Sequence, residues 1–139
     1  MTIGTTAIDA TMHAWNSRDR GAYLDCYAEG CELTSPVGSG TGREYVGAFY
    51  DETVTSFPDN EVIVRRVVAE GDTVVEESTI VGTNTGPVIA PDGSELPATG
   101  RRVELPMAGL HTLRDGRIVS SRFYWDNAAF AVQMGLVEG

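Results

Sequence analysis

The spacing of apolar residues changes at Pro58, and this change restricts the fold more than any other feature of the sequence. Before Pro58, apolar side chains recur at helical spacing at Val46, Phe49, Tyr50, Val54 and Phe57. After it, the β-branched runs EVIVRRVVAE and TVVEESTIVGT are joined by Glu70–Asp72, which predicts a β-hairpin. Helices followed by antiparallel strands predict an α+β domain, with the helices on one face of a curved sheet.

The N-terminal segment predicts a first helix. Thr6 and Asp9 have the spacing of a capping box, with Asp in place of the usual Glu. One face of the helix would then carry Ile8, Met12 and Trp15. We expect this helix to start at the capping box and to end near Ser17.

Shorter elements are expected between the first helix and the helix that ends at Pro58. Asp19 can cap a second helix that runs through Tyr23 and Tyr27. The segment CELTSP predicts a short strand, and VGSGTG predicts a loop. Thr41 and Glu44 form a second capping box, which would start the third helix.

The C-terminal part of the chain predicts a long excursion and a second hairpin. NTGPVIAPDGSELPATG is rich in proline and glycine and reads as a loop or a hairpin tip. RRVELPMAGLHTLR and RIVSSRFYW are expected strands, because Asp115–Gly116 between them is a strong two-residue turn signal. A last short helix, from Asn127 to Met134, would follow Asp126.

Length and charge exclude several classes of protein. The chain has 139 residues, enough for one domain, and a formal net charge of −10. Binding to a phosphate backbone needs a basic surface, so we expect no nucleic-acid partner. The apolar runs are too short to span a membrane. The N-terminus has no basic segment followed by an apolar one, and we therefore expect a cytoplasmic protein.

Several catalytic chemistries lack the residues that they need. All the basic residues are arginines, so no lysine amine is present to form a Schiff base. The spacing of Cys26, Cys31, His13 and His111 does not fit a zinc site, and we expect no metal. The segment GSGTG has Arg43 where a dinucleotide fingerprint needs glycine, and no G-x-S-x-G motif occurs. General acid-base chemistry by a carboxylate, with or without a histidine, remains.

The turn at Asp115–Gly116 predicts a register for the last hairpin. We expect Arg114 to face Arg117, and alternation then places His111 opposite Ser120. One face would carry a pocket-like mixture of apolar and titratable residues: Met107, Gly109, His111, Leu113, Ile118, Ser120, Arg122, Tyr124 and Asp126. The other face would carry Leu110, Thr112, Val119, Ser121, Phe123 and Trp125. A β-bulge would exchange the two faces.

Each candidate residue also has a structural interpretation. Asp126 directly precedes a predicted helix, so it is either an N-cap or a chemical group at a pocket mouth. His111 could be a hydrogen-bonded, half-buried strand residue, and Arg122 could be an ion-pair partner. The aromatic residues at helical spacing are core residues first and pocket walls second: Trp15, Tyr23, Tyr27 and Phe49.

The order of elements and the segments VGTNTG, LRDGRIVSSRFYWD and FAVQMGL resemble the SnoaL-like polyketide cyclases of the nuclear-transport-factor-two-like superfamily. The resemblance runs from Ala7 to Val137 and is most specific in the C-terminal third. It implies a single α+β domain over residues 1–139, a cone-shaped barrel in which a bent antiparallel sheet and three N-terminal helices enclose a pocket. It also implies a homo-oligomer that needs no cofactor.

The resemblance also implies catalytic residues. In these cyclases an aspartate at the end of the last hairpin is the general acid-base group of an intramolecular aldol condensation, and Asp126 stands at that position. A histidine on the preceding strand takes part in some members, and His111 is the nearest match. The chain departs from the family pattern at Ser35, where Asp-Pro is common, and at Asn84, which replaces the histidine of GTHTG.

We interpret the chain as a cofactor-free enzyme of lyase or isomerase type, a polyketide cyclase or a related isomerase. The alternatives are a non-catalytic carrier of a small apolar ligand and an interaction module that uses the sheet surface. Hydroxylation, dehydration and epoxide hydrolysis also occur in the superfamily, and a fold does not choose among reactions. The expected ligand-binding residues are Trp15, Tyr27, Phe49, Met107, Arg122 and Tyr124.

The available groups also restrict the substrate. Without a lysine or a metal, a carbanion must come from a substrate that is acidic itself, such as a β-dicarbonyl or polyketide methylene. Asp126 would then remove or relay the proton. His111 or Tyr124 would donate to the developing oxyanion.

The central hairpin predicts how the chain assembles. Alternate strand positions would leave an apolar outer sheet face with Val62, Val64, Val75 and Val81. Such a face would be wet in a monomer. The sequence therefore predicts a homodimer, with neither a membrane nor a nucleic acid as partner.

Overall fold

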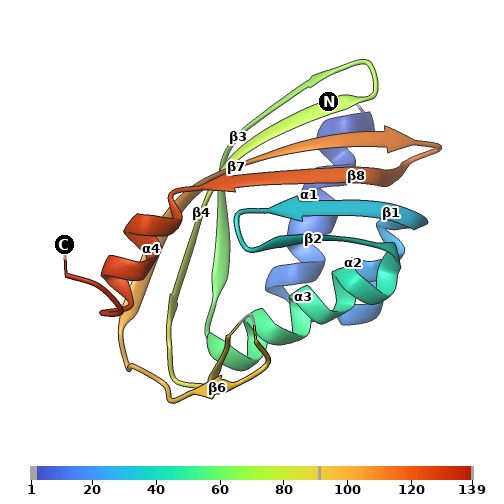
Figure 1. The fold of residues 1–139 in the computed structure, drawn as a ribbon. Helices are drawn as coiled ribbons and strands as arrows, with labels where there is room; N and C mark the ends of the chain where they lie inside the picture. The colour runs from blue at the N-terminus through green and yellow to red at the C-terminus, as the bar shows by residue number, and fades with distance from the viewer. Residues whose placement is uncertain (1–2, 91, 139) are drawn as a thin grey trace.

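The computed structural model describes residues 3–90 and 92–138 and has the expected order of elements (Figure 1). The helices are α1 (Ile3–Asn16), α2 (Arg20–Asp25), α3 (Gly42–Ser56) and α4 (Asn127–Gln133). The strands are β1 (Tyr27–Ser35), β2 (Gly38–Thr41), β3 (Glu61–Glu70), β4 (Thr73–Thr83), β5 (Val88–Ile89), β6 (Glu95–Leu96), β7 (Arg102–Arg114) and β8 (Arg117–Trp125). The prediction of an α+β fold is confirmed. None of the helices in these two ranges is both long and apolar enough to cross a membrane.

Six strands form one curved sheet in the order β2-β1-β8-β7-β4-β3, and β5 pairs separately with β6. The prediction of a wholly antiparallel sheet is wrong for one pair, because β1 and β8 run parallel. Most of the chain separates these two strands, so no tight turn forces them to run antiparallel. The sheet is an open cone with β2 and β3 at its edges, rather than a closed barrel.

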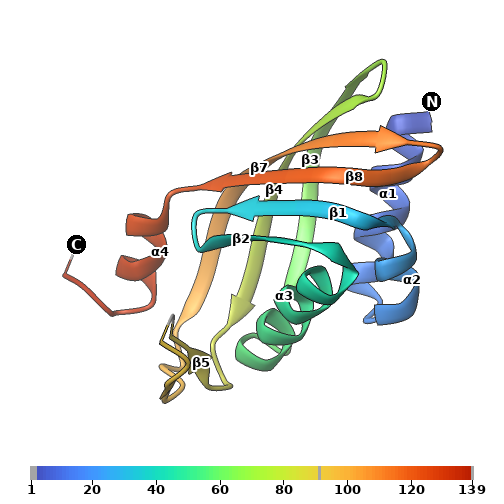
Figure 2. The same ribbon diagram turned by 45° about the vertical axis from the view of Figure 1, so that its right-hand side comes forward.

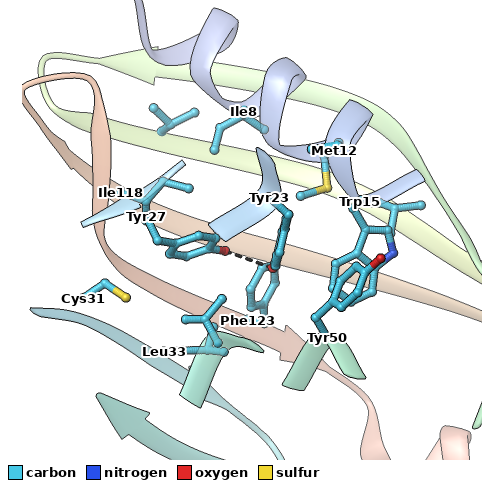
Figure 3. Packing of buried hydrophobic residues seen from close by; sticks show 14 of the residues in the cluster. Ile8, Met12, Trp15, Tyr23, Tyr27, Cys31, Leu33, Tyr50, Ile118 and Phe123 are labelled. Carbon is cyan, nitrogen blue, oxygen red and sulfur yellow. Dashed lines mark hydrogen bonds between the residues drawn. The ribbon is translucent and has the colours of Figure 1, made fainter. Parts of the chain in front are cut away.

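The helices cover the concave face of the sheet. α1 packs against β3 and β4, and α3 packs against β1. α4 lies at the opposite end of the sheet from α1 and α2 (Figures 1 and 2). The main core between helices and sheet includes Ile8, Met12 and Trp15, as their helical spacing predicts (Figure 3).

The first helix begins earlier than its capping signal. α1 already includes Thr6, so the prediction of a capping box from Thr6 to Asp9 is wrong. The part of α1 that precedes Thr6 packs closely on β4, because a Cβ added at Gly4 would lie 2.6 Å from Val74 Cγ2. Tertiary contact therefore extends the helix beyond the position that local capping would choose.

The elements after α1 agree with the sequence in part. Asp19 caps α2 as predicted, and its side chain accepts a hydrogen bond from Ala22 N at 3.1 Å. α2 ends before Tyr27, however, which begins β1. The predicted loop VGSGTG is partly a strand, since Gly38–Thr41 pairs with β1. Thr41 is the N-cap of α3, but its side chain makes no capping hydrogen bond.

A β-bulge in the last hairpin overturns the predicted faces. Arg114 pairs with Arg117 as expected, but the register then shifts, and His111 pairs with Ser121 rather than with Ser120. The extra residue is Val119, and one inserted residue turns every later side chain of the strand to the other face. On β8 the inward side chains are Ser121, Phe123 and Trp125, whereas Ser120, Arg122 and Tyr124 point outward.

The outer face of the sheet also differs from the prediction. Val62 is buried in the core, and Val64 packs against it, so the prediction that both lie on the outer face is wrong. A register shift in β3 between Val64 and Arg66 contributes to this difference. The exposed apolar side chains on the outer face are Val68, Val75, Leu110 and Tyr124. The first three are neighbours across β3, β4 and β7.

Asn84 closes the base of the excursion that carries β5 and β6. Its side chain is fully buried. Its Nδ2 donates to the carbonyl oxygens of Ser56 and Gly86, both at 3.0 Å, and its Oδ1 accepts from Thr99 N at 2.7 Å. One amide therefore ties the excursion to the C-terminal end of α3.

We expect Asn84→Ala to lower the free energy of unfolding by about 1 to 3 kcal/mol, because buried partners of the amide lose their hydrogen bonds. Urea denaturation measures this loss. Thr85→Ala, at the exposed neighbouring position, is the matched control and should stay within about 0.5 kcal/mol of the wild type. Equal stability of the two variants would contradict the role of Asn84.

Candidate functional site

A cavity of about 570 Å³ lies between the concave face of the sheet, α1, α3 and the β5–β6 hairpin. Aromatic side chains make up much of its wall: Trp15, Tyr23, Tyr45, Phe49, Phe57, Phe123, Trp125 and Phe130. This volume falls within the range of pockets that hold small ligands. Aromatic faces favour a planar, largely apolar ligand.

The wall carries little charge. Within residues 3–90 and 92–138, Glu52 on α3 is the one charged side chain that lines the cavity. A carboxylate or phosphate on a ligand would therefore find no cationic partner in this wall, and its burial would be costly. The cavity suits a neutral ligand.

Two polar side chains of the wall are engaged with the protein itself. Asn60 accepts a hydrogen bond from Trp15 Nε1 at 2.7 Å and donates to the carbonyl oxygen of Phe57 at 2.9 Å. Ser56 donates to the carbonyl oxygen of Pro87 at 2.8 Å. These bonds hold the wall in shape, and they occupy groups that a ligand could otherwise use.

Glu76 on β4 and His111 on β7 form a buried hydrogen-bonded pair beside the cavity. His111 Nε2 lies 2.6 Å from Glu76 Oε1, and His111 Nδ1 lies 2.6 Å from Ser121 Oγ. Ser78 donates to the second carboxylate oxygen of Glu76. The side chains of the pair are at most 1% exposed, so each polar atom needs a partner from the protein, and each has one.

Gly109 and Phe123 shape the surroundings of this pair. A Cβ added at Gly109 would lie 2.7 Å from His111 Nε2 and 2.9 Å from Glu76 Oε1, so glycine leaves the space that the pair fills. The ring of Phe123 packs edge-on against the imidazole, with centroids 5.4 Å apart. Phe123 also lines the cavity, so this residue contacts both the histidine and the ligand space.

Two buried tyrosines, Tyr23 and Tyr27, lie next to each other beside the cavity. The hydroxyl of Tyr27 lies 3.3 Å from that of Tyr23 (Figure 3). Burial raises the pKa of Tyr27 to about 12 and raises the pKa of Tyr23 well above its ordinary value. Both phenols therefore keep their protons at neutral pH. Tyr23 lines the cavity, and Tyr27 is buried beneath it.

The structure brings half of the predicted ligand-binding residues together. Three of them line the cavity: Trp15, Phe49 and Met107. Tyr27 is buried beneath the wall, next to Tyr23. Arg122 and Tyr124 are exposed on the outer face of the sheet, so the prediction that they face the pocket is wrong. The bulge at Val119 is the physical reason.

Asp126 has the position of an N-cap. Its Oδ1 accepts a hydrogen bond from Ala129 N at 3.0 Å, and the residue is exposed. Its neighbours Trp125 and Asn127 both line the cavity, whereas Asp126 is not among the lining residues. The expectation that Asp126 shares the inward face with His111 is therefore wrong, and the carboxylate caps α4 next to the cavity wall.

Glu76 and Ser121 are functional candidates that sequence reasoning missed. The position of Glu76 could have been inferred from the sequence. Val74, Glu76 and Ser78 are every second residue of a predicted strand, so they share one face, and the structure buries all three. A carboxylate at such a position needs a buried partner. Ser121 had no comparable signal, because its face depends on a bulge that no glycine or proline marks.

We expect the free energy of unfolding to fall between pH 10 and about pH 12. The folded protein holds the Tyr27 proton up to about pH 12, whereas an unfolded tyrosine loses it near pH 10, so this contribution is complete below pH 10 and is lost as the pH rises. A shift of roughly two units corresponds to at most about 3 kcal/mol. Urea denaturation at about pH 9 and about pH 12 should show a smaller loss for Tyr27→Phe than for the wild type. Tyr124→Phe, on the outer face, is the matched control. Equal losses in the wild type and Tyr27→Phe would contradict the prediction.

Solved structures with the same fold include proteins from several bacteria. A proposed SnoaL-like polyketide cyclase from Jannaschia sp. CCS1 is 24% identical, with 99% of this chain and 96% of that chain aligned and a TM-score of 0.82. IdmH, a proposed polyketide cyclase from Streptomyces antibioticus, is 27% identical. The alignment covers 95% of this chain and 98% of IdmH, with a TM-score of 0.78. AclR, a proposed hydroxylase from Streptomyces galilaeus, is 20% identical. The alignment covers 97% of this chain and 82% of AclR, with a TM-score of 0.80.

The sequence comparisons place the chain in a family. A comparison with curated proteins finds no match. The model of the SnoaL-like domain, in contrast, matches residues 8–121, which is most of the chain. The fold and this match agree, and the protein belongs to the SnoaL-like domain family.

Proposed function

We propose that the protein is an enzyme that cyclises or isomerises a small neutral carbonyl compound by general acid-base catalysis. The observation that carries this proposal is an aromatic cavity whose wall has no cationic side chain among the described residues and which lies one ring away from a buried carboxylate–histidine pair. An apolar pocket with a few polar or titratable groups beside it is typical of ligand-binding and catalytic sites. Membership of the SnoaL-like family favours the intramolecular aldol cyclisation of a polyketide-like substrate.

The wall of the cavity supports a particular class of substrate. A neutral ketone or β-dicarbonyl compound can bury its rings against the aromatic side chains without placing a charge in the wall. The methylene between two carbonyl groups is already acidic. General acid-base assistance is worth about 10²–10⁴-fold, which is enough for such an activated carbon acid.

Two side chains have proposed roles in this reaction. Asp126 takes the proton from the carbon acid, the enolate carbon attacks the acceptor carbonyl, and the new alkoxide takes the proton back. The cap bond to Ala129 N leaves the second carboxylate oxygen of Asp126 for this work. His111 acts on the oxygen side of the reaction without touching the ligand, because it is fully buried and does not line the cavity.

A non-catalytic carrier is the second candidate function. The observation in its favour is that Glu76 and His111 are both sealed from the cavity. An interaction module would instead use the exposed apolar side chains of the outer sheet face. The same acid-base groups could also activate water for epoxide opening, or serve a hydroxylase such as the one proposed for AclR.

Hydrogen–deuterium exchange of 2-tetralone separates these functions. This bicyclic ketone is neutral, and the methylene next to its carbonyl is activated by the aromatic ring. The chain has two tryptophans, Trp15 and Trp125, and both line the cavity, so binding should quench their fluorescence. We expect the protein to accelerate exchange in D2O, followed by NMR, by about 10²-fold or more. A carrier would give quenching without acceleration, and an interaction module would give neither.

Two variants then separate capping from catalysis at Asp126. We expect both Asp126→Asn and Asp126→Ala to lose the acceleration, because neither has a carboxylate. Only Asp126→Ala should also lower the melting temperature, since asparagine is a good N-cap and alanine is a poor one. Wild-type exchange in Asp126→Asn would assign Asp126 to capping alone and remove it from the mechanism.

We also propose that the protein is a homodimer through the outer face of the sheet. Val68, Val75 and Leu110 are neighbours there and are 56%, 42% and 38% exposed, which is unfavourable in water. We expect sedimentation at micromolar concentration to give about twice the chain mass of 14.9 kDa, and Val75→Glu to shift the mass toward the monomer. If the wild-type protein sediments with the mass of a single chain, the proposal of a homodimer is wrong.

A further inference from the structure

We propose that Glu52 selects the substrate, because its carboxylate accepts a hydrogen bond from a hydroxyl group on the ring system of the ligand. The proposal rests on the proposed function, since it takes the ligand to be a neutral ring ketone that lies in the cavity. It adds a narrower substrate class, a hydroxylated ring ketone, and a residue that binds one end of it. Glu52 has no part in the proton transfers of the reaction.

Glu52 lies on the face of α3 that forms one wall of the cavity. The residues of this helix that line the cavity recur at helical spacing: Tyr45, Ala48, Phe49, Glu52, Thr53 and Ser56. Glu52 is therefore directed toward the cavity, one turn after Phe49 and one turn before Ser56. Its neighbour Asp51 does not line the cavity and pairs with Arg20 at 2.9 Å instead.

Glu52 also stands where the cavity meets the solvent. The deep wall is buried, for example at Trp15 and Asn60, whereas Glu52 of α3 and Ile89 of β5 are exposed and still line the cavity. The two elements are in contact. We call this edge, formed by Glu52 and Ile89, the mouth of the cavity. A ligand that fills the aromatic interior and extends to the mouth meets a carboxylate there.

The carboxylate of Glu52 is available to a ligand. Among the described residues, no hydrogen bond or ion pair involves Glu52. On the same helix face, Thr53 and Ser56 already donate to backbone carbonyl oxygens, each at 2.8 Å. Tyr45 packs its ring on β2, where Gly40 leaves the space for it. A carboxylate accepts hydrogen bonds and, when ionised, donates none, so the ligand group that fits Glu52 is a donor.

The charge around the mouth favours a hydroxyl group over an acid. Residues 85–100, which include the β5–β6 hairpin, contain Asp92 and Glu95 and no basic residue. Glu95 pairs with Ile89 in the hairpin, next to the mouth. An acidic group on the ligand would therefore meet like charges, which is unfavourable. A hydroxyl group stays neutral, so it gains the hydrogen bond without repulsion.

Three derivatives of 2-tetralone with different groups at position 6, the far end of the rings from the ketone, test this selection. A hydroxyl group there donates, a methoxy group only accepts, and a carboxyl group is ionised at neutral pH. In isothermal titration calorimetry, we expect the hydroxy compound to bind about three- to tenfold more tightly than the methoxy compound, as one added hydrogen bond predicts. The carboxy compound should bind more weakly than the methoxy compound.

Glu52→Gln keeps the length of the side chain and removes its charge. The amide can accept from a hydroxyl group and can also donate to a methoxy oxygen, so we expect the hydroxy and methoxy compounds to bind about equally. The carboxy compound should bind more tightly than it does to the wild type. Glu44→Gln is the matched control, because Glu44 is exposed on the same helix, outside the cavity wall, and loses the same charge. It should keep the wild-type preference, and both variants should keep the wild-type melting temperature.

The outcomes separate this selection from the proposed function. Equal binding of the hydroxy and methoxy compounds by the wild type, or an unchanged preference in Glu52→Gln, overturns the role of Glu52. Hydrogen–deuterium exchange of the same compounds tests the reaction independently. A wild type that prefers the hydroxy compound without accelerating exchange supports the role of Glu52 and overturns the proposed function. Exchange without the preference overturns the role of Glu52 alone, and a wild type that binds none of the compounds overturns both.

Discussion

The extra residue at Val119 is the constraint on which the interior of the sheet depends. It turns Ser121, Phe123 and Trp125 of β8 toward the helices. Without it, alternation would point Arg122 and Tyr124 inward, and a guanidinium would lie close to the buried carboxylate. The bulge instead places an uncharged hydroxyl opposite His111. The serine partner of His111 and the part of the aromatic wall that β8 supplies follow from this one inserted residue.

The buried pair imposes a second condition on the fold. Glu76 and His111 are removed from water, so each of their polar atoms needs a partner inside the protein. Ser78 and Ser121 supply the remaining partners, from β4 and β8. Three strands must therefore keep their register with respect to one another. Such a network specifies one arrangement of the sheet more strongly than apolar packing does.

In the proposed reaction, the cavity would bind the carbon acid and the titratable groups would lie outside its wall. The aromatic wall, which carries Glu52 as its one charged side chain among the described residues, favours a neutral ligand. Neither titratable group lines the cavity. Asp126 caps α4, and His111 packs against Phe123.

The sequence by itself determined the class of the fold, its two long hairpins and several of its aromatic wall residues. These features depend on local signals: apolar spacing around Pro58, the Asp115–Gly116 turn, and helical spacing that placed Trp15 and Phe49 toward the core. The tertiary structure alone decided which residues meet at the site. A bulge has no fixed sequence mark, yet it exchanges the faces of a strand. The parallel pairing of β1 with β8 brings Tyr27 beside Ile118 from distant parts of the chain. Contacts between residues so far apart depend on the register of the whole sheet, which no local pattern encodes.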